Sequence, residues 1–507
     1  MNERKAGAVL AYLSLVIGTI VSIGYTPIML SLMGKSEYGL YSLASSIIGY
    51  LGVLNFGFGG SYFRFYSRYK VLKDETGIAR LNGMFLSIYF VIGIVILLAG
   101  AILVANSDQV LGSRLSPKEL EIGHILLIIL VLNLVFSLTS TIFSVYISAH
   151  EKFVFQKIIN IIQVIVSPLI TLPVLMMGYG SIGLVVMTSV TTILLNATNI
   201  IFCFRRLKMK FSFNGFEFSL VKEMFIFSSF IFMNMIIDQI NWNVDKYILG
   251  RVKGTAAVAV YSIGATLNNF YLSFASIILS VFVPHVNQLV AQKNDNKELL
   301  NLLIKTGRIQ FFVLVLIVSG FIFLGRPFIR IWVGDDYLSA YYISMLIMLP
   351  VTIPFIQSIG IEIQKAKNRH RFRSIIYLFI AITNVIVSIP LAKRYGGVGC
   401  AFGTMLSMIV GNGFIMNWYY QKKLGLDVIT FWKEIVKFFP ALVMPGLLGI
   451  VILTLFKITN FIELLLFVFL YSVCYIASMW FLGLNDYEKS IFSGFITKVL
   501  NKIERSK

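Results

Sequence analysis

Long apolar stretches separated by short polar connections recur along the chain from its first residues to about residue 483. A helix of about 20 apolar residues covers the roughly 30 Å hydrocarbon core of a bilayer, and about fourteen stretches reach that length. The predicted spans are residues 8–33, 39–63, 83–105, 121–148, 153–177, 181–204, 224–250, 256–285, 308–331, 341–363, 372–392, 398–420, 435–457 and 460–483. The pattern predicts an all-α integral membrane protein with about 14 transmembrane helices, and it favours a membrane transporter.

The connections between the spans differ in charge. The even-numbered connections and the two termini hold roughly three quarters of the 43 Lys and Arg residues, and the odd-numbered connections hold few. Basic residues collect on the cytoplasmic side of a membrane protein. The charge pattern therefore predicts a multi-pass topology in which both termini are cytoplasmic.

Two pairs of similar segments indicate an internal repeat. Residues 34–42 resemble residues 254–262, and residues 179–183 resemble residues 395–399. Both pairs lie about 220 residues apart at the same kind of outer turn, and an even number of spans separates the partners, so the repeat is parallel. We expect two six-helix lobes followed by two C-terminal helices. The predicted division is an N-terminal lobe at 1–215, a C-terminal lobe at 216–425, and two extra helices with a cytoplasmic amphipathic tail at 426–507.

Composition agrees with a membrane protein, because 58% of the residues are hydrophobic, 13% are charged and the mean hydropathy is +0.85. The net charge of +20 is spread over short loops, so we expect anionic phospholipids as partners and no nucleic acid. The sequence holds no phosphate-binding loop motif, no metal-ligand motif and no loop large enough for a soluble catalytic domain. We predict no enzyme activity, no catalytic residues, no cofactor and no metal.

The predicted seventh span carries polar residues on one face. Their spacing of 4, 3 and 4 stacks them along one side of a helix, and they are Asn234, Asp238, Asn241 and Asp245. A charge held mid-membrane costs about 3 kcal/mol, so such a face normally lines a bundle interior or a wet cavity. The repeat places Ser14 opposite Asn234, which gives the first lobe a smaller polar face.

The acidic residues on this face have two interpretations. Asp238 and Asp245 could bind a coupling cation, because a desolvated carboxylate takes up a proton near neutral pH. Alternatively, Asp245 could form a structural ion pair with Lys246 or Arg251 near the outer end of the span. The sequence leaves both open.

Three motifs carry a family resemblance, which extends over residues 1–483. The motifs are the outer turn 34–42, the glycine-rich segment 55–64, and residues 245–250 followed by 260–262. These segments resemble the polysaccharide transporter family of the MOP flippase superfamily, which also contains the MATE exporters and the lipid II flippases. The resemblance implies a MATE-like fold with two lobes around a central cavity, alternating access, and export of a lipid-linked oligosaccharide.

The leading functional hypothesis is a flippase in the bacterial inner membrane. It would translocate undecaprenyl-pyrophosphate-linked oligosaccharide repeat units, for O-antigen, capsule or exopolysaccharide, from the inner to the outer leaflet with cation coupling. Arg64 and Lys246 are candidate phosphate contacts, Asp238 and Asp245 are candidate cation-coupling residues, and Asn234, Asn241 and Ser14 are candidate cavity-lining residues. Arg64 could instead act as a topology anchor together with Arg68.

Partners and alternatives follow from the same hypothesis. A polysaccharide polymerase and other assembly proteins are candidate partners, and the two C-terminal helices could line the path of the lipid tail. The alternative function is a MATE-like cation-coupled multidrug exporter, for which cavity carboxylates are equally suitable. A non-transporting membrane scaffold is a third alternative, against which the buried acidic face argues.

Overall fold

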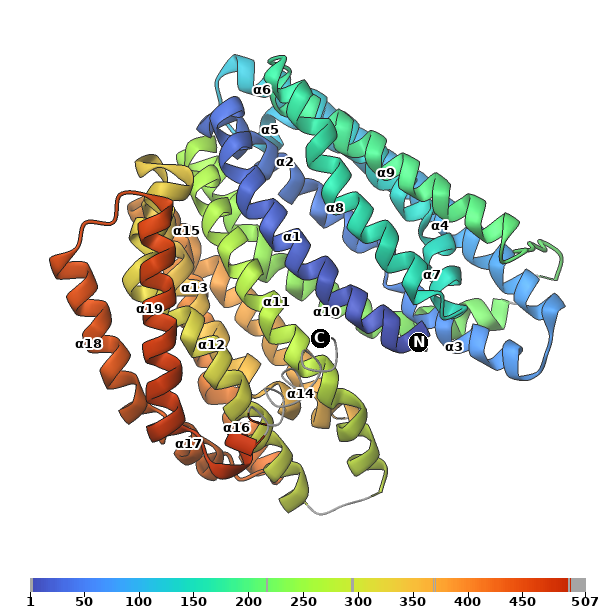
Figure 1. The fold of residues 1–507 in the computed structure, drawn as a ribbon. Helices are drawn as coiled ribbons and strands as arrows, with labels where there is room; N and C mark the ends of the chain where they lie inside the picture. Colours follow the sequence, from blue (N-terminus) through green and yellow to red (C-terminus); the bar gives the residue numbers. More distant parts are fainter. Residues whose placement is uncertain are drawn as a thin grey trace, which may run out of the picture. The chain divides into compact units, whose positions relative to one another are not determined.

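The computed structural model describes residues 3–215, 218–292, 296–367, 369, 371–490 and 493. These residues form helices joined by short connections, with no strand among them (Figure 1). By packing, the chain divides into two compact units. The first comprises residues 1–263 and 381–403, and the second comprises residues 264–380 and 404–507.

The first unit contains ten α-helices and one 3-10 turn, together with the start of α11 and the middle of α15 among the described residues. Its elements are α1 (Glu3–Met33), α2 (Lys35–Gly52), η1 (Val53–Asn55), α3 (Phe58–Val71), α4 (Glu75–Ala105), α5 (Ser107–Leu111), α6 (Pro117–Thr139), α7 (Thr141–Ala149), α8 (Phe153–Met176), α9 (Gly180–Arg205) and α10 (Phe218–Lys253). Helix α1 lies along α8, and α8 packs against α9 (Figure 1).

The second unit contains most of α11 (Thr255–Ala291) and both ends of α15 (Arg371–Met408). Its other elements are α12 (Asn296–Val333), η2 (Asp335–Tyr337), α13 (Ser339–Ile356), α14 (Ser358–Ala366), η3 (Ile409–Ile415), α16 (Met416–Lys423), α17 (Val428–Val436), α18 (Phe439–Leu455), α19 (Phe461–Ser478) and η4 (Met479–Gly483). Elements η3 and η4 are π-helical. Helices α18 and α19 lie side by side, and both pack on α12 (Figure 1).

Twelve segments of the described residues are long and apolar enough to cross a membrane, which confirms the all-helical membrane fold. The predicted count of fourteen is not confirmed. One segment of 52 residues, Phe372–Lys423, covers two predicted spans and contains Gly396, whose φ of 61° and ψ of −138° break the helix between them. Helix α11 coincides with the predicted span 256–285 but is not one of the twelve.

Local sequence signals explain several helix ends. Asp74 accepts a hydrogen bond from the Gly77 amide at 2.8 Å and caps α4. The hydroxyl of Thr76 also donates to Asp74, and these hydrogen bonds lower the pKa of the Asp74 carboxyl. At α6, Ser116 and Glu119 form a reciprocal capping box ahead of Pro117 in the first turn.

Buried polar contacts fix each unit internally. In the first unit, the Tyr62 hydroxyl donates to Asn82 Oδ1 at 2.6 Å, and Asn82 Nδ2 donates to the Lys210 carbonyl at 2.9 Å. This chain of contacts ties the connection after α9 to the buried aromatic core formed by α3 and α4.

The second unit has a buried charge network at α12. Arg308, 2% exposed, donates from Nε and Nη2 to the carboxylate of Glu488, 1% exposed, at 2.6 and 2.9 Å. Its other hydrogen bonds reach the carbonyls of Glu434 and Gly483 at 2.7 and 2.9 Å, and the guanidinium lies 4.3 Å from the Phe438 ring centroid. The network joins α12 to α17 and to the segment after α19.

The predicted domain division stays a prediction. It followed the repeat and set boundaries near residues 215 and 425, whereas packing groups residues by contact and places α10 with the first six predicted spans. The predicted cytoplasmic tail lies mostly outside the described residues.

Candidate functional site

Helix α10 carries the predicted polar face, and its burial changes along the helix. Asn234 and Asp238 are exposed, Asn241 is half-buried, and Asp245 is 1% exposed. The helix packs against α2, η1 and α3. One face of α10 therefore leads from accessible amide and carboxylate groups to a deeply buried carboxylate.

Asp245 is held by a tyrosine of the next helix. The Tyr261 hydroxyl of α11 donates to Asp245 Oδ2 at 2.6 Å, within the range of a charge-assisted hydrogen bond. Arg251, which was one expected ion-pair partner, donates instead to the Tyr247 hydroxyl at 3.0 Å. Lys246 is half-buried on α10. The geometry thus assigns Tyr261 to Asp245, a contact that the sequence analysis missed.

The second candidate span is interrupted next to the polar face. Helix α2 ends in the 3-10 turn η1, and Phe56 and Gly57 then adopt left-handed backbone conformations with φ of 53° and 66° before α3 begins. A positive φ costs conformational free energy for a bulky residue such as Phe56, so the surrounding packing must stabilise this conformation. Broken helices within membrane spans recur at transporter binding sites.

The break packs directly on α10. The Phe56 ring stacks on Phe232 with centroids 4.2 Å apart, and a Cβ on Gly57 would lie 2.3 Å from Ile231 Cγ2. The Oδ1 atom of Asn55 is buried without a hydrogen-bond partner among the described residues. The interruption therefore places unwound backbone and a polar amide beside the start of the polar face.

The other predicted site residues are placed as follows. Arg64 on α3 forms an ion pair with Glu223 on α10 at 3.0 Å, and both side chains are about half exposed. Its guanidinium also lies 5.5 Å from the Phe227 ring centroid. Ser14 is half-buried on α1, a helix that packs chiefly on α8. Arg64 is thus brought onto α10, where a carboxylate already balances its charge.

A hydrogen-bonded cluster joins three helix starts at the other end of the first unit. Glu119 Oε1 accepts from the hydroxyls of Ser36 and Thr255, the latter at 2.6 Å, and these two hydroxyls lie 2.8 Å apart. Glu119 Oε2 accepts from the Ser116 amide at 2.8 Å. One carboxylate therefore connects the starts of α2, α6 and α11, which we call the Glu119 cluster.

The repeat segments meet at this cluster. A Cβ on Gly39 would lie 1.9 Å from the Thr255 carbonyl oxygen and 3.2 Å from the Ala259 nitrogen. Gly39 and Ala259 occupy equivalent positions in the repeated segments 34–42 and 254–262. Packing of equivalent positions is the arrangement that a two-fold axis passing between them produces.

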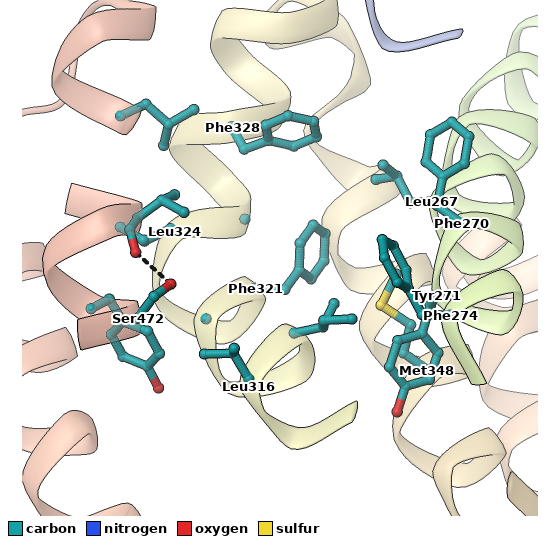
Figure 2. A pocket seen from close by; sticks show the side chains of 16 residues that line it. Leu267, Phe270, Tyr271, Phe274, Leu316, Phe321, Leu324, Phe328, Met348 and Ser472 are labelled. Carbon is teal, nitrogen blue, oxygen red and sulfur yellow. Dashed lines mark hydrogen bonds between the residues drawn. The ribbon is translucent and has the colours of Figure 1, made fainter. Parts of the chain in front are cut away.

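The second unit encloses an apolar cavity of about 380 Å³ between α11, α12, α13 and α19. Figure 2 shows aromatic side chains of α11 and Met348 of α13 on one side of it, Phe321 of α12 near its centre, and Ser472 of α19 on the other side. The Ser472 hydroxyl donates to the Val468 carbonyl of its own helix at 2.7 Å, so the lining has little free polarity.

Sequence comparison decides the family. The model of the family described as "Polysaccharide biosynthesis protein" matches residues 28–342, more than half of the chain. The chain belongs to this family. This confirms the family resemblance drawn from residues 34–42, from residues 55–64 and from residues 245–250 with 260–262.

Individual relatives agree. The "Putative O-antigen transporter" of Shigella flexneri is 21% identical over 416 residues, which cover 80% of this chain and 95% of that protein. The solved structure "Lipid II flippase MurJ, inward closed conformation" covers 97% of this chain and 99% of its own, with a TM-score of 0.70 and 18% identity. An inward-facing multidrug resistance MATE transporter covers 82% of this chain and 99% of its own, with a TM-score of 0.62 and 12% identity. At these identities the two structures establish the fold of this family member.

Proposed function

We propose that this family member is a flippase that moves lipid-linked oligosaccharide repeat units from the inner to the outer leaflet of the bacterial inner membrane. The observation that carries the proposal is the family match, together with an O-antigen transporter that is covered over 95% of its length. Undecaprenyl-pyrophosphate is the carrier that such units would use. Both termini would lie in the cytoplasm, with a polysaccharide polymerase and other assembly proteins acting after release.

The apolar cavity of the second unit supports a lipid substrate. Its lining on α12 runs from Leu316 to Phe328, which is about 18 Å along a helix. The α19 helix that closes one side belongs to the two extra C-terminal helices. A cavity of this length and apolar lining suits a segment of polyprenyl chain. Moving the apolar surface of that chain from a polar environment into the cavity lowers the free energy.

The charged head would need the polar face of α10. A pyrophosphate carries about two negative charges, and a membrane potential that is negative inside drives it outward by roughly 2.3 kcal/mol per charge per 100 mV. Lys246 and Arg64 would contact phosphate, and for Arg64 the phosphate would have to displace Glu223 from the ion pair. Asn234, Asn241 and Ser14 would offer hydrogen bonds to the sugars.

Cation coupling would use the two carboxylates differently. Asp238 is exposed and so is accessible to a proton or Na⁺, whereas Asp245 is buried and engaged by Tyr261. We assign loading of the cation to Asp238. Asp245 would respond through its hydrogen bond to α11, which links the charge state of α10 to the Glu119 cluster at the start of the same helix.

A second function, export of cationic drugs, is supported by the likeness to MATE transporters and by the acidic face of α10. A deletion strain separates the two. If the flippase proposal holds, lipid-linked repeat units accumulate on the cytoplasmic face and surface polysaccharide is lost, while the wild-type gene restores both. Normal surface polysaccharide together with increased sensitivity to cationic dyes would contradict the flippase proposal and support drug export.

A further inference from the structure

The first unit contains a second cavity, with charged residues in its lining, that the proposed transport cycle does not use. It has a volume of about 470 Å³ and lies where α1 begins, α8 begins and α9 ends. We call it the headgroup pocket. Its lining combines three charged residues with an apolar wall: Glu3, Lys152, Val154, Phe155, Ile158, Phe202, Arg206 and Leu207.

The charged residues of the headgroup pocket form an incomplete set. Lys152 Nζ lies 3.5 Å from Glu3 Oε1, longer than a charge-assisted hydrogen bond, and both side chains are a little under half exposed. Arg206 is exposed at the end of α9. The second carboxylate oxygen, Glu3 Oε2, is buried and has no hydrogen-bond partner among the described residues. Two cationic groups and one carboxylate group therefore lie together at the pocket, and they suit a ligand that carries both a negative and a positive charge.

The wall of the pocket is rigid and leads onto an apolar face. The Phe155 and Phe202 rings stack with centroids 3.8 Å apart and planes 13° from parallel, which fixes α8 against α9. From Ile158 an exposed apolar ridge continues along α8 at helical spacing, through Ile162, Ile165 and Leu169. A ligand held at the charged end would have its apolar part on this ridge, which is the shape of a membrane lipid and not of a free phosphate.

We propose that the headgroup pocket binds phosphatidylethanolamine. The lipid phosphate would accept from Lys152 and Arg206, and the ammonium would donate to the carboxylate of Glu3, whose side chain is partly exposed at the pocket. The volume equals that of about fifteen water molecules, which is ample for this headgroup. Phosphatidylcholine lacks an N–H donor for Glu3, and phosphatidylglycerol offers only hydroxyls while adding a net negative charge next to that carboxylate.

The test uses the purified, delipidated full-length protein and native mass spectrometry with short-chain phosphatidylethanolamine, phosphatidylcholine and phosphatidylglycerol. We expect phosphatidylethanolamine to bind about tenfold more tightly than phosphatidylcholine, as one hydrogen bond between charged groups would give. Glu3→Gln should remove most of this preference, because the amide keeps the shape but loses the charge. Arg206→Gln should weaken binding of the lipids generally.

The matched control is Arg205→Gln, which removes the same charge from the adjacent position without altering the pocket lining. It should bind phosphatidylethanolamine like the wild type. Only variants whose melting temperature equals that of the wild type are compared. Equal affinity for phosphatidylethanolamine and phosphatidylcholine overturns the proposal. A preference for phosphatidylglycerol also overturns it, because that result would identify an anionic-lipid site. Full displacement of the lipid by millimolar inorganic phosphate overturns it too, because that result would identify a free-phosphate site.

Discussion

The four polar residues of α10 share one face but not one environment. Asp238 is exposed, whereas Asp245 is buried and accepts a hydrogen bond from Tyr261. A buried carboxylate with a dedicated donor is suited to positioning, and an accessible one is suited to binding and releasing an ion. The two residues should therefore respond differently to the same substitution.

Asp238→Asn should abolish gradient-driven transport while the protein remains inserted, because the amide keeps the hydrogen-bonding shape but cannot titrate. Surface polysaccharide at matched expression level is the measurement. Asp245→Asn should be milder, because an amide oxygen still accepts from Tyr261. Normal polysaccharide in the Asp238→Asn strain would show that the polar face is structural.

Tyr261→Phe should destabilise the protein by about 1–3 kcal/mol, because it removes the hydrogen bond that the buried Asp245 carboxylate accepts from the Tyr261 hydroxyl. Thermal unfolding of the purified protein gives the difference. In an Asp245→Asn background the same change should cost less, since a neutral amide is easier to leave unpaired. Equal losses in the two backgrounds would mean that the hydroxyl stabilises the protein through other contacts.

His150, in the connection between α7 and α8, predicts a pH effect on stability. Burial lowers its pKa below the ordinary value of 6.5, although the hydrogen bond of Nδ1 with the Tyr146 carbonyl raises it. Of its charged neighbours, Lys70 and Lys152 lower the pKa and Glu75 raises it.

Because the unfolded chain then binds the proton more readily, His150 favours the folded state above its unfolded pKa, and this advantage declines as the pH falls through about 6.5. His150→Gln should flatten the fall in melting temperature between about pH 7.5 and about pH 5.5. A parallel fall in the wild type and the variant would assign the pH dependence to other groups.

At this scale the sequence predicted the residue types better than their partners. Helical spacing put Asp238 and Asp245 on one face, but periodicity within α10 cannot say which neighbouring helix covers which part of that face. Tyr261 stood in a recognised motif, yet its contact with Asp245 depends on the turn between α10 and α11. Glu223 likewise meets Arg64 only through packing of α3 on α10.

At the scale of elements, the Glu119 cluster marks where the repeated segments meet. If transport proceeds by alternating access, we predict that this junction at the start of α2 and α11 separates during the cycle. A Ser36→Cys/Thr255→Cys pair, in a background without the native cysteines, should form a disulfide because the hydroxyls lie 2.8 Å apart. Oxidation should stop lipid-linked oligosaccharide transport, and reduction should restore it.

The control pair is Glu37→Cys/Ser181→Cys, which joins α2 to α9 within the first repeat. Glu37 Oε1 accepts from the Ser181 amide at 2.7 Å and hydroxyl at 2.8 Å. This contact is made by the end of a long side chain, so the control pair is joined with a short bifunctional thiol reagent, which is also applied to the test pair. Cross-linking of the control should leave transport unchanged. Continued transport with the test pair fully oxidised would show that the junction stays closed throughout the cycle.

The elements themselves were largely predictable, because about 20 apolar residues in a row allow few alternatives. Their interruptions were harder to predict. The glycine-rich segment 55–64 suggested a span end, but the structure shows that the helix stops, turns through Phe56 and Gly57, and resumes as α3. Gly396 similarly breaks a helix that hydropathy divides into two spans. Glycine marks such positions without saying whether the chain ends, bends or reverses there.

For the whole molecule, the orientation follows from charge and is directly testable. A membrane-impermeant thiol reagent on intact cells should label Ser113→Cys in the exposed connection before α6 and should spare Arg205→Cys at the end of α9. Permeabilised cells, in which both sites should react, provide the control. Labelling of Arg205→Cys alone would invert the predicted topology.

The distribution of Lys and Arg can predict sidedness because it acts through each connection separately. The division into packed units could not be predicted in this way. The repeat assigns residues by ancestry and α10 to the second half, yet contacts of α10 with α2 and α3 group it with the first. Which helices pack together depends on the conformation of the transporter, and the same sequence can adopt more than one conformation.

The Arg308 network has a consequence for biogenesis. Arg308 enters the membrane with α12, but Glu488 is made 180 residues later, after α19. Until then the guanidinium has only the more distant Glu434 carboxylate, at 3.6 Å, and lacks its close buried partner. Removal of one member of a buried ion pair costs about 3–5 kcal/mol. A chain released before Glu488 would keep that cost permanently. The segment after α19 thus completes the charge network of the second unit, and we expect chains truncated before Glu488 to be less stable than the full chain.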